Sequence, residues 1–402
     1  MELDNYVATK NKISSKNSLL SVIEKIEHAN GLPNEYYISD KLFESEKHTV
    51  IFNNWSGLAF GKDIPHVGDI RPVNFLGLPL LIVRTEKNKI NVFENTCRHR
   101  GMILLQEDQH FRKNIRCPYH NWCYGLDGSL ESTPHVGGIG VHKHKDIKPD
   151  LLGLNQIRSY LWKDIIFINI SGAAQNFKDN FSKLITRWED FEKPVIFGGD
   201  DSSFSLTLKA NWKLAVENYC ESYHLPSVHP DLNKTSKLED HYDICESPKY
   251  SGQGSYKYRQ LSDDEGNVFP DFEDLSEKWD QGTEYVAIYP NVLMGVHRDL
   301  IFSVILNPIS VEETTERVAF YYSSVLPSNK KINALKASNH LFWRDVLEED
   351  VFVVEGMQKG RYSNMFDGGK FSPTMDQPTH NFHVWFAKQV LQNDTDTKEQ
   401  SK

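Results

Sequence analysis

The sequence predicts an α+β protein in which an all-β domain comes first and a mixed domain follows. Two observations lead to this prediction. Short apolar runs of strand length, separated by turn residues, begin near Val50 and continue to about residue 170. Beyond that point strand patterns alternate with helical ones, and apolar residues recur at helical spacing through 335–359. With 402 residues, the chain is long enough for two domains.

The first elements are helical, and strands follow them. Residues 17–50 have a helical pattern that turn-forming residues interrupt at 30–33. Residues 78–85 and 89–93 flank a polar turn, which predicts a β-hairpin. The Ile-rich segment 161–170 predicts a further strand.

The second half is predicted to be a mostly antiparallel sheet with long helices. Residues 203–208 have a strand pattern, and a helix is expected to begin near Asn211. A long polar excursion over 233–280 follows, and strands are expected again at 300–306 and 318–326.

We therefore expect four segments along the chain. They are a helical lead-in packed on the second domain (1–49), the all-β domain (50–170), the mixed domain (171–392) and a disordered polar tail (393–402).

Composition and charge exclude some classes of function. The net charge of −10 argues against a nucleic-acid binder and against docking to anionic membranes. No stretch approaches eighteen apolar residues, and the polar segment 1–16 has no apolar core of a signal peptide. The five Cys are expected to stay reduced, so we expect a cytoplasmic protein.

Two short motifs combine one Cys and one His each. Cys97 and His99 form the first, and Cys117 and His120 form the second. A Rieske [2Fe–2S] cluster needs this ligand set, because two Cys hold one iron and two His hold the other. The alternatives are a structural Cys₂His₂ zinc site or thiols that only pack. Zinc motifs usually keep Cys with Cys and His with His, so the mixed motifs favour the cluster.

A second constellation follows Asn211. On an ideal helix, Glu217, Glu221 and His224 fall on one stripe. His229 would point elsewhere, but Pro226 disfavours helix before it and lets the chain bend back. Two His on either side of such a break suit a metal ion. The alternative is two unrelated surface His near a helix end.

An O₂-activating Fe(II) site needs two His and one carboxylate, with open positions. Asp350 supplies a candidate, since it lies in the apolar stripe of the helix 335–359, with Glu348 and Glu349 facing away or at the margin. An acid on a buried face needs a strong partner. A metal ion is one such partner; a buried Arg or a helix cap is the other.

With these motifs in place, the chain resembles the catalytic α subunits of Rieske non-haem iron oxygenases from about residue 35 to 390. The resemblance implies a Rieske domain ahead of a helix-grip catalytic domain, assembled head-to-tail as a homotrimer, with or without a β subunit. It assigns Cys97, His99, Cys117 and His120 to the cluster. It assigns His224, His229 and Asp350 to mononuclear iron.

The same resemblance gives Glu221 a catalytic role, because the matching acid bridges a cluster His of one subunit to an iron-ligand His of the next. Many ring-hydroxylating members have Asp there, and Glu is similar to the branch that oxidises carnitine and other quaternary amines. The family also implies O₂ as co-substrate and a separate flavin and iron–sulfur reductase or a ferredoxin. NAD(P)H would serve only through that partner, since this chain has no Gly-rich dinucleotide loop.

The substrate stays open at this level. One hypothesis is a monooxygenase that hydroxylates a small molecule, including N-demethylation of a betaine-like compound. The second is an aromatic ring-hydroxylating dioxygenase, and the third is a Rieske electron carrier without oxygenase activity. Candidate pocket aromatics are Tyr219, Tyr223, Tyr289, Trp343 and Phe352. Arg298 is a candidate for gripping a substrate carboxylate, with a structural ion pair as the alternative.

Overall fold

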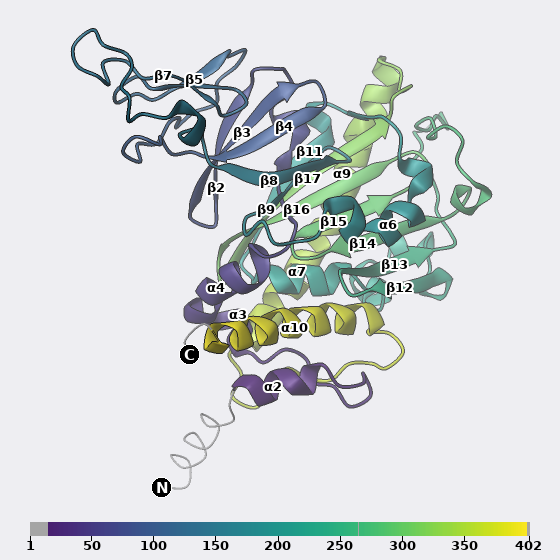
Figure 1. Cartoon of the computed structure of the whole chain (residues 1–402). Helices are drawn as coiled ribbons and strands as arrows, with labels where there is room; N and C mark the ends of the chain where they lie inside the picture. The colour runs from purple at the N-terminus through teal and green to yellow at the C-terminus, as the bar shows by residue number, and fades with distance from the viewer. Residues whose placement is uncertain (1–14, 264, 400–402) are drawn as a thin grey trace, which may run out of the picture. The chain divides into compact units, whose positions relative to one another are not determined.

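The computed structural model describes residues 15–263 and 265–399 and divides the chain into two compact units (Figure 1). Residues 53–177 form one, which we call the β unit; residues 1–52 and 178–402 form the other, which we call the mixed unit. The mixed unit is therefore built from both sides of the β unit in sequence. Residues 1–14, where no export signal is expected, lie outside the described residues.

All strand pairs of the β unit are antiparallel. Six strands form one sheet in the order β1-β9-β8-β4-β3-β2, and three form a small sheet in the order β5-β6-β7. Their bounds are β1 (Ser56–Phe60), β2 (Ile70–Phe75), β3 (Leu78–Glu86), β4 (Lys89–Glu94), β5 (Asn114–Arg116), β6 (Cys123–Gly125), β7 (Leu130–Ser132), β8 (Gln156–Trp162) and β9 (Ile165–Asn169). The predicted hairpin at 78–93 is confirmed as β3 and β4.

The strand predicted over 161–170 is confirmed as β9, but its predicted start is wrong. β8 ends at Trp162 and β9 begins at Ile165, and these two residues face each other across a hairpin. Lys163 and Asp164 between them have φ of 47° and 62°. Two successive left-handed residues are what a tight hairpin turn requires. Neither residue is glycine, so no strong turn signal marks this position in the sequence.

The mixed unit contains one large antiparallel sheet in the order β10-β17-β16-β15-β14-β13-β12, and β11 also pairs with β17. The strands are β10 (Val195–Phe197), β11 (Ser203–Leu208), β12 (His241–Ser247), β13 (Tyr250–Ser255), β14 (Thr283–Ile288), β15 (Val292–Val296), β16 (Ile301–Ser310) and β17 (Glu313–Ser323). The strand predicted at 203–208 is confirmed. The polar excursion predicted over 233–280 is partly wrong, because β12 and β13 form a hairpin within it.

Helices cover this sheet, and three of them, α2 to α4, form the N-terminal lead-in. They are α2 (Ser15–Val22), α3 (Glu35–Ile38), α4 (Asp40–Glu46), α5 (Phe177–Asn180), α6 (Ser182–Arg187), α7 (Trp212–Tyr219), α8 (Leu225–Val228), α9 (Lys330–Gly360) and α10 (Gln377–Glu399). A π-helical turn, Lys47–Ile51, follows α4 directly. In Figure 1, α10 lies beside α2, and the two are in contact.

A buried ion pair joins the lead-in to α7. Lys213 Nζ lies 2.7 Å from Glu46 Oε2, and both side chains are almost fully buried. The Trp212 indole N–H also donates to Glu46, so both carboxylate oxygens have a partner. Burying a charge is costly unless it is paired. This pair therefore fixes α4 against the helix from which the functional site begins.

The C-terminal helix extends further than predicted. A disordered tail was expected from 393, whereas α10 continues to Glu399. Extending an existing helix avoids the unfavourable step of nucleating a new one. None of the described helices is both long and apolar enough to pass through a membrane.

Candidate functional site

Two loops of the β unit present the predicted Cys and His residues with matching backbone geometry. In the first loop the Cys97 N–H donates to Met102 O at 2.8 Å, and in the second the Cys117 N–H donates to Trp122 O at 2.8 Å. Each loop is also closed by a β pair between the residue before its Cys and a residue on the far side. The two loops therefore have the same backbone structure, as expected if each provides one Cys and one His to the same cluster.

The matching turns need a left-handed residue at the same place. Gly101 has φ 73° in the first loop, and Asn121 has φ 59° in the second. Asn is one of the few other residues that adopt this conformation without a large penalty. The backbone amides of both donate to the carbonyl of the preceding Cys, each at 3.0 Å.

The four side chains fit a Rieske cluster. Cys97 and Cys117 are each 3% exposed and belong to the apolar core of this unit, whereas His99 is exposed and His120 is half-buried. The two imidazole rings meet edge to face, with centroids 4.7 Å apart and an interplanar angle of 69°. Burial raises the pKa of the Cys117 thiol, and a metal ion would reverse this by binding the thiolate. Two buried sulfurs beneath two outer imidazoles are the donor set of such a cluster.

Tyr124 approaches one of these sulfurs. Its hydroxyl lies 3.3 Å from Cys97 Sγ and accepts a hydrogen bond from the Arg98 backbone N–H at 3.0 Å. Burial raises the pKa of Tyr124, so the phenol keeps its proton at neutral pH. With its acceptor position used by Arg98, the hydroxyl has its proton available to donate to the sulfur.

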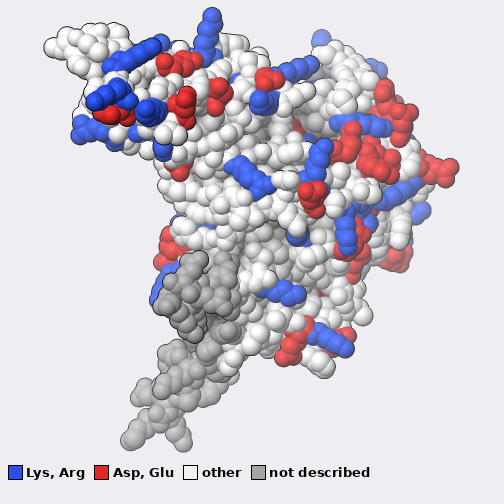
Figure 2. Space-filling model, in the orientation of Figure 1, with Lys and Arg blue, Asp and Glu red and all other residues white. Residues whose placement is uncertain are grey.

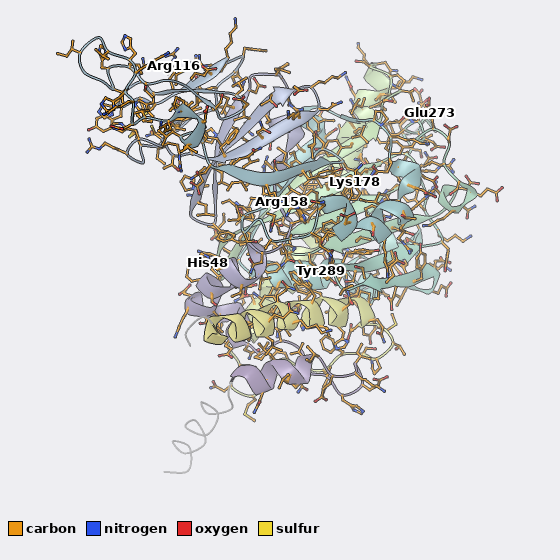
Figure 3. The ribbon with its side chains drawn as sticks, viewed as in Figure 1. His48, Arg116, Arg158, Lys178, Glu273 and Tyr289 are labelled. Carbon is orange, nitrogen blue, oxygen red and sulfur yellow. The ribbon has the colours of Figure 1, made fainter. Side chains whose placement is uncertain are left out.

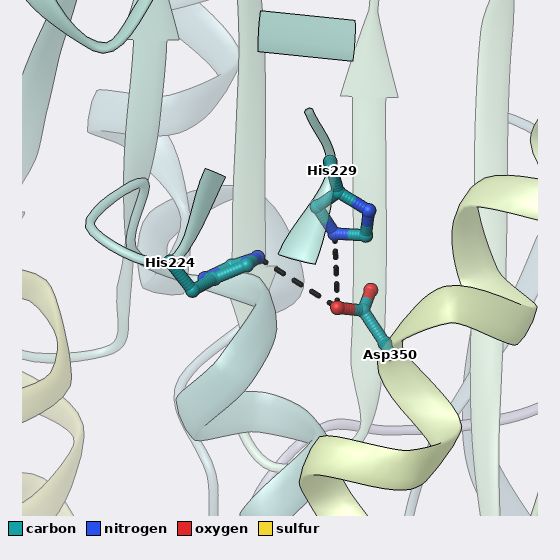
Figure 4. A group of neighbouring side chains, drawn as sticks. All are labelled: His224, His229 and Asp350. Carbon is teal, nitrogen blue, oxygen red and sulfur yellow. Dashed lines mark ion pairs between the residues drawn. The ribbon is translucent and has the colours of Figure 1, made fainter. Parts of the chain in front are cut away.

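In the mixed unit, α7 and α9 bring together the second predicted constellation. The Asn211 side chain caps α7 by accepting from the Lys213 N–H at 3.1 Å, and the Asn329 side chain caps α9 by accepting from the Ile332 N–H at 3.0 Å. α7 packs on α9 and on the sheet. Asp350 lies on the side of α9 that faces the segment following α7 (Figure 4).

His224, His229 and Asp350 converge. The Nε2 atom of His229 is 2.9 Å from Asp350 Oδ1, and that of His224 is 3.7 Å from the same oxygen (Figure 4). One ligand atom from each residue lies within 4.8 Å of the other two. This is the two-His, one-carboxylate set expected for non-haem Fe(II).

Two glutamates orient the imidazoles. The Nδ1 atom of His224 lies 2.7 Å from Glu221 Oε1, and that of His229 lies 2.7 Å from Glu349 Oε2. Each Nδ1–H therefore donates to a carboxylate. In the neutral imidazole this leaves the lone pair of Nε2 available to a metal ion. Outer carboxylates of this kind fix the tautomer and the ring orientation of metal-binding His.

A cation would satisfy the resulting arrangement. Two Nε2 lone pairs and Asp350 Oδ1 face one another, and this buried oxygen has no hydrogen-bond partner among the described residues. With both imidazoles neutral, the short approach of His229 Nε2 to Asp350 Oδ1 brings two acceptors together, and either a proton on the ring or a metal ion would relieve it. Such a group costs free energy unless a positive charge lies between its members. The residues present therefore fit a metal ion.

Two details of the helical prediction are wrong. α7 ends at Tyr219, so Glu217, Glu221 and His224 do not share a helix stripe. Glu217 instead forms a buried contact with Tyr37, whose hydroxyl donates to it at 2.5 Å. Pro226 does not break the helix either: it lies in the first turn of α8, where its missing N–H has no helical partner to lose. The bend lies earlier, between α7 and α8.

Glu349 is a residue of this site that the sequence pattern did not indicate. Its position beside Asp350 on α9 places it at the margin of the apolar stripe, and it was expected to face away. The structure turns its carboxylate to His229. Only the spatial position of His229 reveals this contact, since 120 residues separate the two in the chain.

A small cavity of about 60 Å³ adjoins the three converging residues. Four aromatic side chains contribute to its wall, namely Tyr219, Tyr285, Phe302 and Trp343. Phe302 and Trp343 lie closest to each other, with ring centroids 4.6 Å apart. Three polar residues of the wall, Ser236, His241 and Gln253, form a hydrogen-bonded chain: His241 Nδ1 meets Gln253 Oε1 at 2.5 Å, and Ser236 Oγ meets His241 Nε2 at 2.9 Å. We call this space the inner cavity.

Of the five predicted pocket aromatics, the structure brings Tyr219 and Trp343 to the inner cavity. Tyr223 and Phe352 are exposed, at 53% and 73%. Tyr289 is buried elsewhere: its hydroxyl meets Ser251 Oγ at 2.5 Å, and its ring packs on α10 (Figure 3). Tyr285 and Phe302 were missed because they come from strands, and nothing in their local pattern distinguishes them from core residues.

Arg298 does not reach this cavity. Its guanidinium binds both carboxylate oxygens of Asp271, at 2.9 and 2.5 Å. The structural ion pair is therefore the correct one of the two alternatives, although the partner is Asp271 and not the neighbouring Asp299.

Comparisons with known proteins agree with this geometry. Residues 54–145 match the family model of the Rieske [2Fe-2S] domain, and residues 198–392 match that of the ring hydroxylating alpha subunit, catalytic domain. The glycine betaine monooxygenase oxygenase subunit of Pseudomonas aeruginosa is 24% identical, over 94% of this chain and 93% of its own. The carnitine monooxygenase oxygenase subunit of Escherichia coli is 24% identical, over 84% of this chain and 86% of its own.

Solved structures share the fold. The quaternary ammonium Rieske monooxygenase CntA superimposes with a TM-score of 0.72 at 20% identity, covering 93% of this chain and 98% of its own. Naphthalene 1,2-dioxygenase from Rhodococcus sp. gives the same TM-score at 16% identity, covering 94% of this chain and 98% of its own. Structural likeness thus does not separate the two kinds of oxygenase, and the site must do so.

Proposed function

Since this chain belongs to the Rieske non-haem iron oxygenases, we propose that it is the oxygenase component of a monooxygenase acting on a methylated quaternary amine. The observation that carries the proposal is the inner cavity, where four aromatic side chains stand beside His224, His229 and Asp350. The curated relatives, which are glycine betaine, carnitine and choline monooxygenases by name, support the same substrate class.

This chain has residues that could bind both metal groups of the family. In our proposal Cys97, His99, Cys117 and His120 hold the [2Fe–2S] cluster, and the converging triad His224, His229 and Asp350 holds Fe(II). Together these groups supply stored electrons and a place for O₂ activation. The residues around them orient ligands, place the substrate and exclude water.

Glu221 has two tasks in this proposal. Its contact with the His224 imidazole at 2.7 Å fixes the ring for metal binding. In the family, the matching acid also meets a cluster His of the neighbouring subunit, and we assign Glu221 the same place in a homotrimer. Its side chain is only 13% exposed in the single chain, so it is held by local contacts before any partner arrives.

The size and chemistry of the inner cavity fit a small cationic group. A water molecule needs roughly 10–15 Å³ of such space, so about 60 Å³ holds four to six small groups. A trimethylammonium head has four carbon and nitrogen atoms and fits in this space beside the triad. Aromatic faces attract a quaternary ammonium by about 0.5–2 kcal/mol for each cation–π contact.

The reaction balances with the family's stoichiometry. One oxygen atom of O₂ enters a C–H bond of an N-methyl group, and the other leaves as water with two electrons and two protons. The resulting N–CH₂OH loses its hydroxyl proton, and the C–N bond breaks with its electron pair going to nitrogen, which releases formaldehyde and a tertiary amine. The chain needs those electrons from outside.

A separate reductase supplies the electrons, as in the family. The β unit carries 15 Lys and Arg against 11 Asp and Glu, whereas the whole chain has a net charge of −10. Figure 2 shows Lys and Arg side chains together with Asp and Glu on the surface of this unit, and Figure 3 labels Arg116 in it. We propose that an acidic iron–sulfur protein docks on this surface. The described cysteines form no disulfide, which fits a reducing cytoplasm.

The test is product analysis with the reconstituted enzyme, its reductase and ¹⁸O₂. We expect formaldehyde from a trimethylammonium compound in proportion to O₂ consumed, and no turnover in Asp350→Ala. A cis-diol from an arene, without formaldehyde from any methylated amine, contradicts the proposal. Two irons per chain in the purified protein, unchanged in Asp350→Ala, would support an electron carrier.

A further inference from the structure

A second, larger cavity adjoins the inner one. It has a volume of about 230 Å³, and we call it the outer cavity. The two cavities share four wall residues, Leu232, Ser236, Tyr285 and Trp343. A ligand in the inner cavity therefore has a direct continuation into the outer one.

The outer cavity differs from the inner one in charge. Lys257 and Arg259 contribute to its wall, and among the described residues no carboxylate does. The only acid that lines the inner cavity, within the same described part of the chain, is the proposed metal ligand Asp350. The pair of cavities is thus aromatic at the metal end and positive at the other.

Of the two cations in this wall, Arg259 is the one whose guanidinium has no partner among the described residues. The Lys257 ammonium donates to Gln281 Oε1 at 3.2 Å, so it already has a polar partner. Other polar groups in this wall are engaged as well: the Tyr258 hydroxyl donates to Asp299 at 3.0 Å, and the Gln260 amide donates to Asp271 at 2.9 Å. Arg259 makes no hydrogen bond or ion pair with any described residue and is exposed at the cavity.

From this arrangement we propose that the outer cavity is a carboxylate-binding subsite and that Arg259 selects substrates with an anionic end. A guanidinium presents a planar fork of donors that matches a carboxylate. The rings of the inner cavity carry negative faces, which attract the cationic end and repel an anion. The two cavities together thus fit a zwitterion in one orientation, with its quaternary nitrogen beside the metal site and its carboxylate several bonds away at Arg259.

This inference rests on the proposed function and narrows it. A methylated amine without a carboxylate, such as choline, fills the inner cavity and leaves Arg259 unpaired. A short betaine such as trimethylammonioacetate places its carboxylate one carbon from the nitrogen, still among the aromatic rings. A longer one, 4-(trimethylammonio)butanoate, has a chain that spans from one cavity to the other.

The experiment compares these three compounds as ligands of the full-length holoprotein. Binding is measured anaerobically by titration calorimetry, and formaldehyde release is measured separately with reductase and O₂. We expect 4-(trimethylammonio)butanoate to bind the parent protein most tightly. In Arg259→Gln its Kd should rise about tenfold, while that of choline changes less than twofold. Arg259→Lys should recover part of the loss, since it keeps the charge without the fork.

The matched control is Arg344→Gln. Arg344 is also an exposed arginine of the mixed unit, but it pairs with Glu348 on α9 and lines neither cavity. An equal loss in Arg344→Gln and Arg259→Gln, or an equal loss for choline and the butanoate, overturns the subsite. So does a parent protein that binds choline as tightly as the butanoate.

The two proposals fail in different ways. If no methylated amine yields formaldehyde, the proposed function is wrong, whatever the calorimetry shows. If all three compounds yield formaldehyde and Arg259→Gln changes none of their Kd or KM values, the proposed function stands and the subsite is wrong.

Discussion

Replacing Glu349 by Gln should weaken Fe(II) binding without disturbing the fold. The carboxylate of Glu349 accepts from His229 Nδ1 at 2.7 Å, and that imidazole is only 3% exposed. A hydrogen bond to a charged group contributes about 1.5–3 kcal/mol. Because the Glu349 side chain is itself 44% exposed, we take the lower end of this range. Glutamine keeps an acceptor but loses the charge, so the expected loss is on the order of 1.4 kcal/mol, or tenfold in Kd.

The assay is an anaerobic titration of protein depleted of mononuclear iron, in competition with a chromogenic Fe(II) chelator. Glu348→Gln is the matched control, because Glu348 is the adjacent residue of α9 and its carboxylate pairs with Arg344 at 2.7 Å. It should bind Fe(II) like the parent protein. A Glu349→Gln protein whose Kd lies within twofold of this control would refute the assignment of Glu349 as the residue that orients His229.

Three further outcomes are expected. Tyr124→Phe removes the hydroxyl 3.3 Å from Cys97 Sγ. Because a hydrogen bond to a cluster sulfur stabilises the reduced form, its loss should lower the cluster's reduction potential by on the order of 60 mV. A redox titration that gives the parent value contradicts this. Lys213→Met removes the ion-pair partner of the buried Glu46 carboxylate, so the free energy of unfolding measured in urea should fall by about 3–5 kcal/mol. Adding Glu46→Gln should recover part of this loss. A double variant no more stable than Lys213→Met argues against the pair. Burial lowers the pKa of His297 to about 3, far below the unfolded value of about 6.5, so unfolding takes up a proton and stability falls as pH drops through this window. Between pH 8 and 5.5 the parent protein should lose about 1.4 kcal/mol that His297→Phe retains, and parallel pH curves for the two proteins would show that the ring titrates normally.

The Cys and His motifs could be predicted from sequence because each is local. Cys97 and His99 lie in one tight turn, and Cys117 and His120 lie in another, so spacing alone limits what each pair can bind. Asp350 was predictable for a different reason. An apolar helical stripe implies a buried face, and a carboxylate is rarely buried without a partner. An acid in such a stripe is therefore a candidate for a special role.

Contacts across the fold were not predictable in the same way. Glu349 meets a His far away in the chain, and Tyr285 and Phe302 reach the inner cavity from neighbouring strands of the sheet. Their sequence surroundings are those of an ordinary exposed helix residue and of ordinary core aromatics. Local pattern cannot show which of many similar residues faces a particular space.

The sequence by itself determined the ligand types, the two-domain order and the position of each candidate metal ligand, because these depend on residue identity and short-range spacing. The tertiary structure decided how His224 and His229 are oriented and which aromatic rings line the inner cavity. It also decided that Arg259, and not Arg298, has a guanidinium beside the outer cavity with no partner among the described residues. Those features depend on distances between residues remote in the chain. They are set when α7, α9 and the large sheet pack together, and no shorter segment contains them.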